Sequence, residues 1–251
     1  MEEILSLNKS DLDYFNRGEF ENKKFFSRLN GEPDFTGLKV LDIGCGHGSL
    51  CVHIGLREPQ KIIGIDIDEH RVEFAQNNMQ KNFPNLSNRV EFKILDIENL
   101  DEYDFDIIVS KDSFEHIVSL EKCLQEIIKR LKSGGKLYLG FGPLYNSYYG
   151  DHKRTGSIIP WGHILRSDEN IIRSINRKRP NNEKINSICD LGLNKYSLKQ
   201  YEELINNCGL KILFWGTNVS KHPVLKLFTQ IAKINFLREF FTHNIYCILE
   251  K

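Results

Sequence analysis

The sequence lacks a net charge, a long apolar run and a paired-cysteine motif. Its 34 basic and 34 acidic side chains cancel, so no overall charge attracts the molecule to nucleic acid or to an anionic membrane. No apolar run approaches the roughly 20 residues of a membrane span. The six cysteines show no C-x-x-C pair, which favours reduced thiols. We therefore expect no nucleic-acid partner, no membrane span and a cytoplasmic location.

The start of the chain also differs from a secretory signal, because Met1-Glu2-Glu3-Ile4 is acidic where such a signal is basic. What the sequence does contain is the composition of an ordinary globular protein. Its 251 residues are 40% hydrophobic and 27% charged, which is enough for one α/β domain with a full core and one sizeable insertion.

The most informative stretch is residues 39–48. A short apolar run predicts a strand buried on both faces, and a helix-compatible stretch begins at Ser49. Between them stand three alternating glycines, Gly44, Gly46 and Gly48. A glycine turn between a strand and a helix lets a ligand lie directly against the backbone.

The spacing of these glycines is G-x-G-x-G, whereas the dinucleotide fingerprint is G-x-G-x-x-G. Asp42 lies in the strand just before them and favours a cationic ligand over a pyrophosphate. The run V-L-D-I-G-C-G-H-G resembles the first motif of the class I S-adenosylmethionine-dependent methyltransferases. The resemblance implies that Asp42 and the loop, including Cys45 and His47, bind the methionyl part of S-adenosylmethionine.

Later acids fit the same resemblance. Asp66 ends the next predicted strand, 22 residues after Gly44, close to the spacing of an acid that binds ribose hydroxyls, and Ile67 follows it. We interpret Asp68 as the cap of a helix over 69–82. Asp96 ends a third strand and matches the family position that faces the adenine amino group, beside the backbone of Ile97. A loop-capping role for Asp96 is the alternative.

The run Lys111-Asp112-Ser113-Phe114-Glu115-His116 resembles the family's fourth motif and adds Lys111, Asp112 and His116 to the predicted cofactor site. It lacks the (Asp/Asn/Ser)-Pro-Pro-(Tyr/Phe) signature of enzymes that methylate amino groups of nucleic-acid bases, which argues against that class. A helix over 119–131 should follow and end at the glycines of 132–135.

Strands alternating with helices predict an α/β fold with parallel pairing. The resemblance specifies a seven-stranded Rossmann-like methyltransferase sheet, mostly parallel, with helices on both faces and the last strand (241–249) antiparallel between the fifth and sixth. We divide the chain into an N-terminal helical cap (1–35), a cofactor-binding core (36–142), a substrate-binding insertion or lid (143–195) and the rest of the core (196–251). Ser197 and Gln200 form a predicted capping box.

The insertion should select the acceptor. Its aromatic and basic side chains suit a flat, partly polar ligand, and we expect substrate contacts from Tyr145, Tyr148, Tyr149, Trp161 and Arg166. The basic residues between 177 and 184 either dock an anionic group or form a solvated flap. An apolar helix predicted over 223–236 either packs on the domain or forms a homodimer surface; the alternative is contact with an apolar substrate tail or a membrane surface.

A hydroxyl acceptor must lose its proton during methyl transfer, and a histidine suits that role. His152 is the first candidate for the general base and His163 the second. Either could instead be an ordinary hydrogen-bonded residue. We expect no metal, although Asp151, His152 and His163 could together form a metal site.

These observations predict a methyltransferase (EC 2.1.1.-) that O-methylates a small molecule or glycan and releases S-adenosylhomocysteine. N- or carboxyl-methylation of a small metabolite is the alternative within the class. A nicotinamide-dependent oxidoreductase and a non-catalytic cofactor-binding module are the alternatives outside it.

Overall fold

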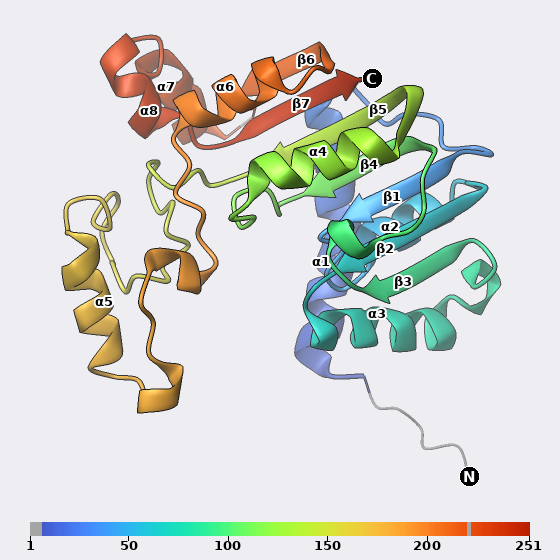
Figure 1. Ribbon diagram of the computed structural model, residues 1–251, viewed down its shortest axis with the longest axis horizontal. Coiled ribbons are helices and arrows are strands. Elements are labelled where there is room, and N and C mark those ends of the chain that lie inside the picture. The colour runs from blue at the N-terminus through green and yellow to red at the C-terminus, as the bar shows by residue number, and fades with distance from the viewer. Residues whose placement is uncertain (1–6, 220–221) are drawn as a thin grey trace.

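The computed structural model describes residues 7–219 and 222–251, so the acidic start of the chain and the first part of the predicted 1–35 cap lie outside the described residues. Within the described residues, seven strands form one sheet in the order β3-β2-β1-β4-β5-β7-β6 (Figure 1). Neighbours from β3 to β5 run parallel, and β7 is antiparallel to both β5 and β6. The predicted fold is confirmed.

The strands are β1 (Lys39–Ile43), β2 (Lys61–Asp66), β3 (Val90–Ile94), β4 (Phe105–Lys111), β5 (Leu131–Phe141), β6 (Lys211–Thr217) and β7 (Ile245–Glu250). The α-helices are α1 (Lys9–Arg28), α2 (Ser49–Gly55), α3 (Glu69–Asn82), α4 (Leu120–Arg130), α5 (Asp168–Asn176), α6 (Leu198–Asn207), α7 (Pro223–Ile231) and α8 (Arg238–Phe241). Short 3-10 turns are η1 (Pro84–Leu86), η2 (Ile97–Asn99), η3 (Asn181–Glu183), η4 (Ile188–Leu191) and η5 (Asn235–Leu237).

Alternation along the strands divides the core into two layers. In β1, Leu41 belongs to the layer under α4 and α6, while Val40 belongs to the layer under α1, α2 and α3. Both side chains are fully buried, and burying such a side chain stabilises the fold by about 1.5–3 kcal/mol. Because both faces are covered, the edge at the carboxyl ends of the parallel strands is left for ligands.

Helix α1 packs closely against the start of α2. A Cβ on Gly18 would lie 2.2 Å from Ser49 Oγ, so the two backbones approach closely. The buried Asn22 donates from Nδ2 to the Ser49 carbonyl at 3.0 Å. This contact places α1 beside the glycine loop of residues 44–48.

Two predicted helix caps are confirmed, and three predicted boundaries are wrong. Asp68 accepts from the Arg71 N–H, and Ser197 and Gln200 form a reciprocal capping box. Helix α4 ends at Arg130, before the predicted stop at 132–135, because Leu131 is already extended and pairs with Phe105 in the sheet.

The other two differences lie near the C-terminus. The helix predicted over 223–236 ends at Ile231, and the strand predicted over 241–249 begins only at Ile245. Asn218 explains the late start: its side chain donates to the Phe241 carbonyl and accepts from the His243 N–H, at 2.7 Å each. These bonds hold the connection away from the sheet ladder.

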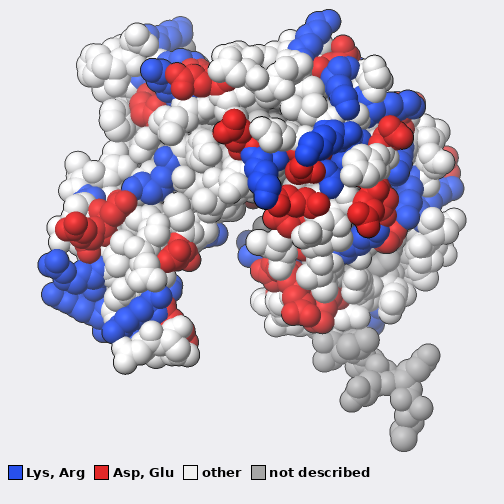
Figure 2. All heavy atoms as spheres, in the orientation of Figure 1, with Lys and Arg blue, Asp and Glu red and all other residues white. Residues whose placement is uncertain are grey.

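The insertion lies at the edge to which the parallel strands point (Figure 1). It has a small core of its own, formed by Tyr145, Ile171, Ile185, Ile188, Leu191 and Leu193. Figure 2 shows Lys and Arg gathered over the far end of α5, where the sequence places Arg173 and the basic residues of 177–184. Among the helices of the described chain, none combines the length and the apolar character that crossing a bilayer requires.

Candidate functional site

A cavity of about 570 Å³ lies at the carboxyl ends of β1, β2 and β4, a volume typical of a site for a small ligand. Its walls come from 42–47, 49–50, 65–68, 71, 95–98, 111–113, 116–119 and Cys123, with Tyr14 contributed by α1 and with Arg154 and Gly192 by the insertion. Figure 2 shows the molecule hollowed between the insertion and the sheet. A second hollow of about 410 Å³, at the amino ends of the strands, is lined by none of the predicted site residues.

The glycine loop forms the floor of this cavity. The backbone N–H groups of Gly44 and Cys45 both donate to the Ile65 carbonyl, which fixes the loop against β2. Gly44 has φ 74°, and a Cβ there would lie 2.1 Å from Ser113 Oγ. A side chain at this position would therefore be strained and would also collide with the loop after β4.

Asp42 lies below the loop and is 1% exposed. Burial raises the pKa of its carboxyl group to about 7, although the Cys51 thiol, which donates to Oδ2 at 3.3 Å, and the nearby Lys111 oppose the rise. A buried carboxylate that lines a cavity gains stability from a cationic ligand, because the ligand replaces the lost hydration of the charged form.

Asp66 ends β2 at the cavity wall. Its Oδ2 accepts from the Gly46 N–H at 2.9 Å, and its Oδ1 accepts from the Asp68 N–H at 3.0 Å. These bonds hold the carboxylate rigidly and leave it further lone pairs, since each oxygen can accept more than one hydrogen bond. Asp66 and Asp68 both line the cavity but make different contacts: the carboxylate of Asp66 fixes the loop, and that of Asp68 caps α3.

The next part of the wall is apolar. Ile67 is 75% exposed at the cavity, and Leu95, Ile97 and Val118 also line it. Asp96 caps η2 by accepting from the Glu98 N–H at 3.2 Å, and it lines the cavity as well. Asp96 therefore both caps a turn, as one prediction had it, and lines the cavity, as the other did. An exposed isoleucine beside a fixed carboxylate suits a flat heterocycle.

At the inner end, Lys111 donates from Nζ to Asn22 Oδ1 at 2.7 Å, which links β4 to α1. His47 also contacts α1: its Nε2 lies 3.2 Å from Asp11, and its ring centroid lies 4.7 Å from that of Tyr14. Burial lowers the pKa of His47 and raises the pKa of Asp112. Helix α1 thus covers one side of the cavity.

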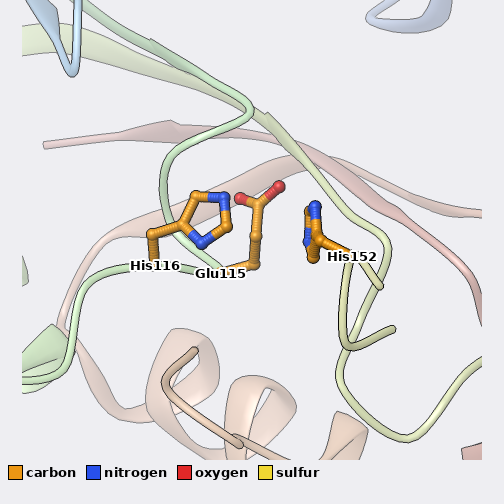
Figure 3. Close-up of side chains that lie close together, drawn as sticks. All are labelled: Glu115, His116 and His152. Atoms are coloured by element: carbon orange, nitrogen blue, oxygen red, sulfur yellow. The ribbon is translucent and has the colours of Figure 1, made fainter. Parts of the chain in front are cut away.

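A second group of polar side chains adjoins the cavity. The ligand-capable atoms of Glu115, His116 and His152 all lie within 4.8 Å of one another, and His116 lines the cavity. Figure 3 shows the carboxylate of Glu115 between the two imidazole rings. Burial raises the pKa of Glu115 to about 8 and lowers the pKa of His152 to about 4.

His152 and His163, the two predicted base candidates, lie in different environments. His152 packs on His116, with ring centroids 4.8 Å apart, but does not itself line the cavity. His163 is fully buried: its Nε2 is 2.6 Å from the Tyr145 carbonyl oxygen, and its Nδ1 is 3.7 Å from Asp151. Asp151 in turn accepts from Thr155 and the Lys153 N–H. The alternative metal set of Asp151, His152 and His163 is therefore not assembled.

The five predicted substrate residues also lie outside the cavity lining. Tyr145 packs in the insertion core, and Tyr149 donates to the Ile158 carbonyl. Tyr148 and Trp161 form an aromatic cluster with Phe228 of α7 and with Phe241 of α8. Arg166 donates to the carbonyls of Thr155 and Asn170. These side chains hold the insertion in place.

Sequence reasoning missed Tyr14, Arg71, Ser113, Arg154 and Gly192, all of which line the cavity. Arg154 donates to the carbonyls of Leu191 and Gly192 at 2.8 and 2.9 Å, and so connects two distant parts of the insertion. No motif marks Arg154 or Tyr14. Ser113 lies within the fourth-motif run of residues 111–116, and that position is a signal for a residue of the cofactor site.

The segment that carries most of the cavity residues is similar to methyltransferases. A family model described as a methyltransferase domain matches residues 34–141. The human mitochondrial ubiquinone biosynthesis O-methyltransferase is 36% identical over 113 residues, covering 43% of this chain and 30% of that protein. Phosphoethanolamine N-methyltransferase 1 of Arabidopsis thaliana is 31% identical over 119 residues, covering 47% and 23%. The chain thus spans less than a third of either curated relative.

A solved structure extends the likeness beyond the matched segment. The S-adenosylmethionine-dependent methyltransferase from Mesorhizobium loti superposes with a TM-score of 0.57, covering 90% of this chain and 96% of that one, at 12% identity. At that identity the likeness concerns the fold alone.

Proposed function

We propose that the chain is a class I S-adenosylmethionine-dependent methyltransferase that transfers a methyl group from S-adenosylmethionine to a hydroxyl group of a small molecule or glycan; the methyltransferase-domain match over residues 34–141 supports this. The observation that carries the proposal is one cavity that joins the glycine loop and the strand-end acids to a histidine of the Glu115–His116–His152 group. When bound, the cofactor supplies a methyl group on a positively charged sulfur.

The donor set fits this cofactor. Asp42 would bind the ammonium group. Its carboxyl group is buried but lines the cavity, which supports that role. Asp66 would accept from the two ribose hydroxyls, because a carboxylate can accept from both at once. The exposed Ile67 and the neighbouring Ile97 would cover the adenine ring, with Asp96 near its amino group.

The remaining predicted cofactor residues would contact the methionyl chain and the methyl group. Gly44, Cys45, Gly46 and His47 would border the methionyl chain, and Lys111, Asp112 and His116 would border the reacting end. Gly48, the fifth predicted loop residue, does not line the cavity, and a Cβ there would collide with Phe92. Positioning is the main contribution that these residues make, since aligning two reactants in a closed site can supply much of the rate enhancement.

Proton removal would take place at the histidine pair. Burial lowers the pKa of both His116 and His152, so both rings are neutral at pH 7 and carry a lone pair. His116 borders the cavity and His152 lies behind it. We therefore place the acceptor oxygen next to His116 and leave His163 out of the proposed site.

The acceptor would enter between the insertion and α1, both of which contribute residues to the cavity wall. O-methylation agrees with the human relative, which is an O-methyltransferase, whereas the Arabidopsis relative is an N-methyltransferase and supports the alternative. The division into cap, core and insertion at 1–35, 36–142, 143–195 and 196–251 and the cytoplasmic location stay predictions.

Calorimetric titration of the purified protein with S-adenosylmethionine, S-adenosylhomocysteine and NAD tests the cofactor assignment. We expect the first two to bind, and Asp66→Ala to weaken them about 100-fold, because two charge-assisted hydrogen bonds are lost. Asp68→Ala is the matched control: it should cost about 1 kcal/mol of folding stability and change the affinity less than about threefold.

Binding of NAD without binding of the other two would contradict the proposal and favour the oxidoreductase alternative. Once the cofactor is confirmed, incubation with labelled methyl donor and separate phenol, sugar, amine and carboxylate acceptors identifies the acceptor atom. Labelled amine products without labelled ethers would replace O-methylation by N-methylation.

A further inference from the structure

The side chains of Glu115, His116 and His152 come from two distant segments of the chain and converge on one point. Glu115 and His116 follow β4, whereas His152 lies in the insertion. Their ligand-capable atoms are within 4.8 Å of one another, and Figure 3 shows the Glu115 carboxylate between the rings of His116 and His152. Nitrogen and oxygen ligands at about 2.1 Å from a tetrahedral ion are about 3.4 Å apart, so closure requires movements on the order of 1 Å.

Two of the three converging groups end in buried atoms without a partner. Within residues 7–219 and 222–251, Glu115 Oε2 and His152 Nε2 accept and donate no hydrogen bond. Glu115 is 4% exposed. Buried polar atoms in folded proteins are nearly always paired, so a pair of unpaired atoms facing each other indicates a missing group.

The outer atoms of Glu115 and His116 are held by backbone groups. Glu115 Oε1 accepts from the Gly142 N–H at 3.1 Å. His116 Nδ1 lies 2.6 Å from the Gly192 carbonyl oxygen, so this nitrogen carries the proton and Nε2 keeps its lone pair. Backbone contacts of this kind orient the ligands of metal ions in proteins.

The charges around the group are mixed. Besides burial, Asp112 raises and Arg154 lowers the pKa of Glu115, and Asp151 raises and Arg154 lowers the pKa of His152, which also interacts with His116 and His243. Arg154 NH1 also lies 3.5 Å from His116 Nδ1. Asp112 borders the cavity and adds a second negative charge to the electrostatic environment of Glu115. Among these charged neighbours of Glu115 and His152, Arg154 is the cation and there is no lysine. The site is therefore compatible with a divalent cation.

We infer that Glu115, His116 and His152 bind a divalent transition-metal ion that holds the acceptor oxygen for methyl transfer. Two imidazoles and one carboxylate favour zinc and its neighbours over magnesium, which prefers all-oxygen ligands. Three protein ligands leave a coordination position open. His116 lines the cavity, so that position is accessible to the acceptor.

The inference rests on the proposed methyl transfer and replaces the histidine base of its proton-removal step by a metal ion. The acceptor hydroxyl binds the ion, which lowers its pKa, and its proton leaves to solvent. The oxygen then forms a bond to the methyl carbon while the carbon–sulfur bond breaks and its electron pair stays on sulfur. The products are a methyl ether and S-adenosylhomocysteine, and no oxidant or reductant is needed. His116 and His152 then act as ligands and not as the direct base.

The experiment measures metal binding without any acceptor. The chelator-treated full chain is dialysed against zinc, and its metal content is determined; cobalt(II) then serves as a spectroscopic probe, since its visible bands report nitrogen and oxygen coordination. We expect one ion per chain. Glu115→Gln, His116→Ala and His152→Ala should each weaken binding at least about 100-fold. His70→Ala is the control, because that side chain is 69% exposed and lies outside the group.

Glu115→Gln preserves the size of the side chain and its Gly142 contact, so loss of metal in this variant is not explained by unfolding. Titration with S-adenosylmethionine, with and without zinc, is the second measurement. Cofactor binding without stoichiometric metal binding, or unchanged metal binding in the three variants, overturns this inference and leaves the proposed function standing. Metal binding without cofactor binding contradicts the proposed function instead.

Discussion

The two halves of the cavity are built by different means. On the side of the sheet, short motifs place backbone groups and carboxylates directly at strand ends, and Asp42, Asp66 and Asp96 all line the cavity. On the side of the insertion, most conspicuous side chains contact one another: Tyr148 packs on Trp161, and Asp151 accepts from Thr155. The first half is specified by local sequence, and the second by packing between distant segments. A residue's chemistry therefore indicates its role far better in the first half.

The largest effect should come from the glycine loop. Gly44→Ala places a Cβ 2.1 Å from Ser113 Oγ at φ 74°, so the loop must move. We expect cofactor affinity, measured by calorimetry, to fall about 100-fold or more, because the loop supplies the floor of the cavity.

Gly134→Ala is the matched control. Gly134 has φ 76°, and a Cβ there meets no atom within 4 Å. This variant should lose about 1 kcal/mol of stability from backbone strain and retain the cofactor affinity of the wild type. Equal affinities in the two variants would show that the loop backbone does not contact the cofactor.

The next largest effect concerns the charge of Asp42. Its carboxyl group has a pKa of about 7 in the unliganded fold, whereas a bound ammonium group requires the carboxylate. Below pH 7, binding must therefore release a proton, and affinity should rise by up to about tenfold per pH unit until it levels off above about pH 7.5. Asp42→Asn should lower the affinity and abolish this pH dependence.

The same shift has the opposite sign for the stability of the unliganded protein. Between the ordinary carboxyl pKa of 3.8 and about 7, the folded state keeps a proton that the unfolded chain has lost, so the contribution of Asp42 to stability decreases as the pH rises through this window. 5′-Methylthioadenosine, which has no amino-acid part, is the control ligand. A pH dependence of its affinity as steep as that of S-adenosylmethionine would contradict the assignment of Asp42 to the ammonium group.

The sequence predicts the sheet side of the cavity better than the insertion side. Asp68 and Ser197 cap helices through bonds to residues three positions away, so a local pattern identifies them. The convergence of Glu115 and His152 depends on the path of the insertion, and no spacing reveals it. His163 and Trp161 have the right chemistry for a site, but burial and aromatic packing use them elsewhere. Chemistry alone does not tell these cases apart.

A smaller effect should come from the aromatic cluster of Tyr148, Trp161, Phe228 and Phe241. Trp161 also donates from Nε1 to the Phe240 carbonyl at 3.0 Å. Trp161→Ala should lower the free energy of unfolding by about 2 kcal/mol and leave cofactor affinity unchanged. Trp161→Phe keeps the ring packing and should lose about 1 kcal/mol.

Chemical denaturation measures both variants, and limited proteolysis shows whether the insertion has loosened. If Trp161→Ala unfolds like the wild type but raises the KM for the acceptor, Trp161 contacts the substrate, as the sequence predicted. The insertion would then resemble the sheet side, where side-chain chemistry indicates function directly.

The smallest effect should come from Arg154, which reaches the cavity from the insertion. Its NH1 group is bonded to the carbonyls of Leu191 and Gly192, so we expect it to support the cavity wall without binding the cofactor. Arg154→Lys keeps the charge but loses the guanidinium geometry, and should cost about 1 kcal/mol of stability with less than about a twofold change in cofactor affinity. Denaturation and calorimetry on the same variant measure both quantities. A loss of affinity above about tenfold would mean that the insertion also holds the cofactor, and that the two halves of the cavity act as one site.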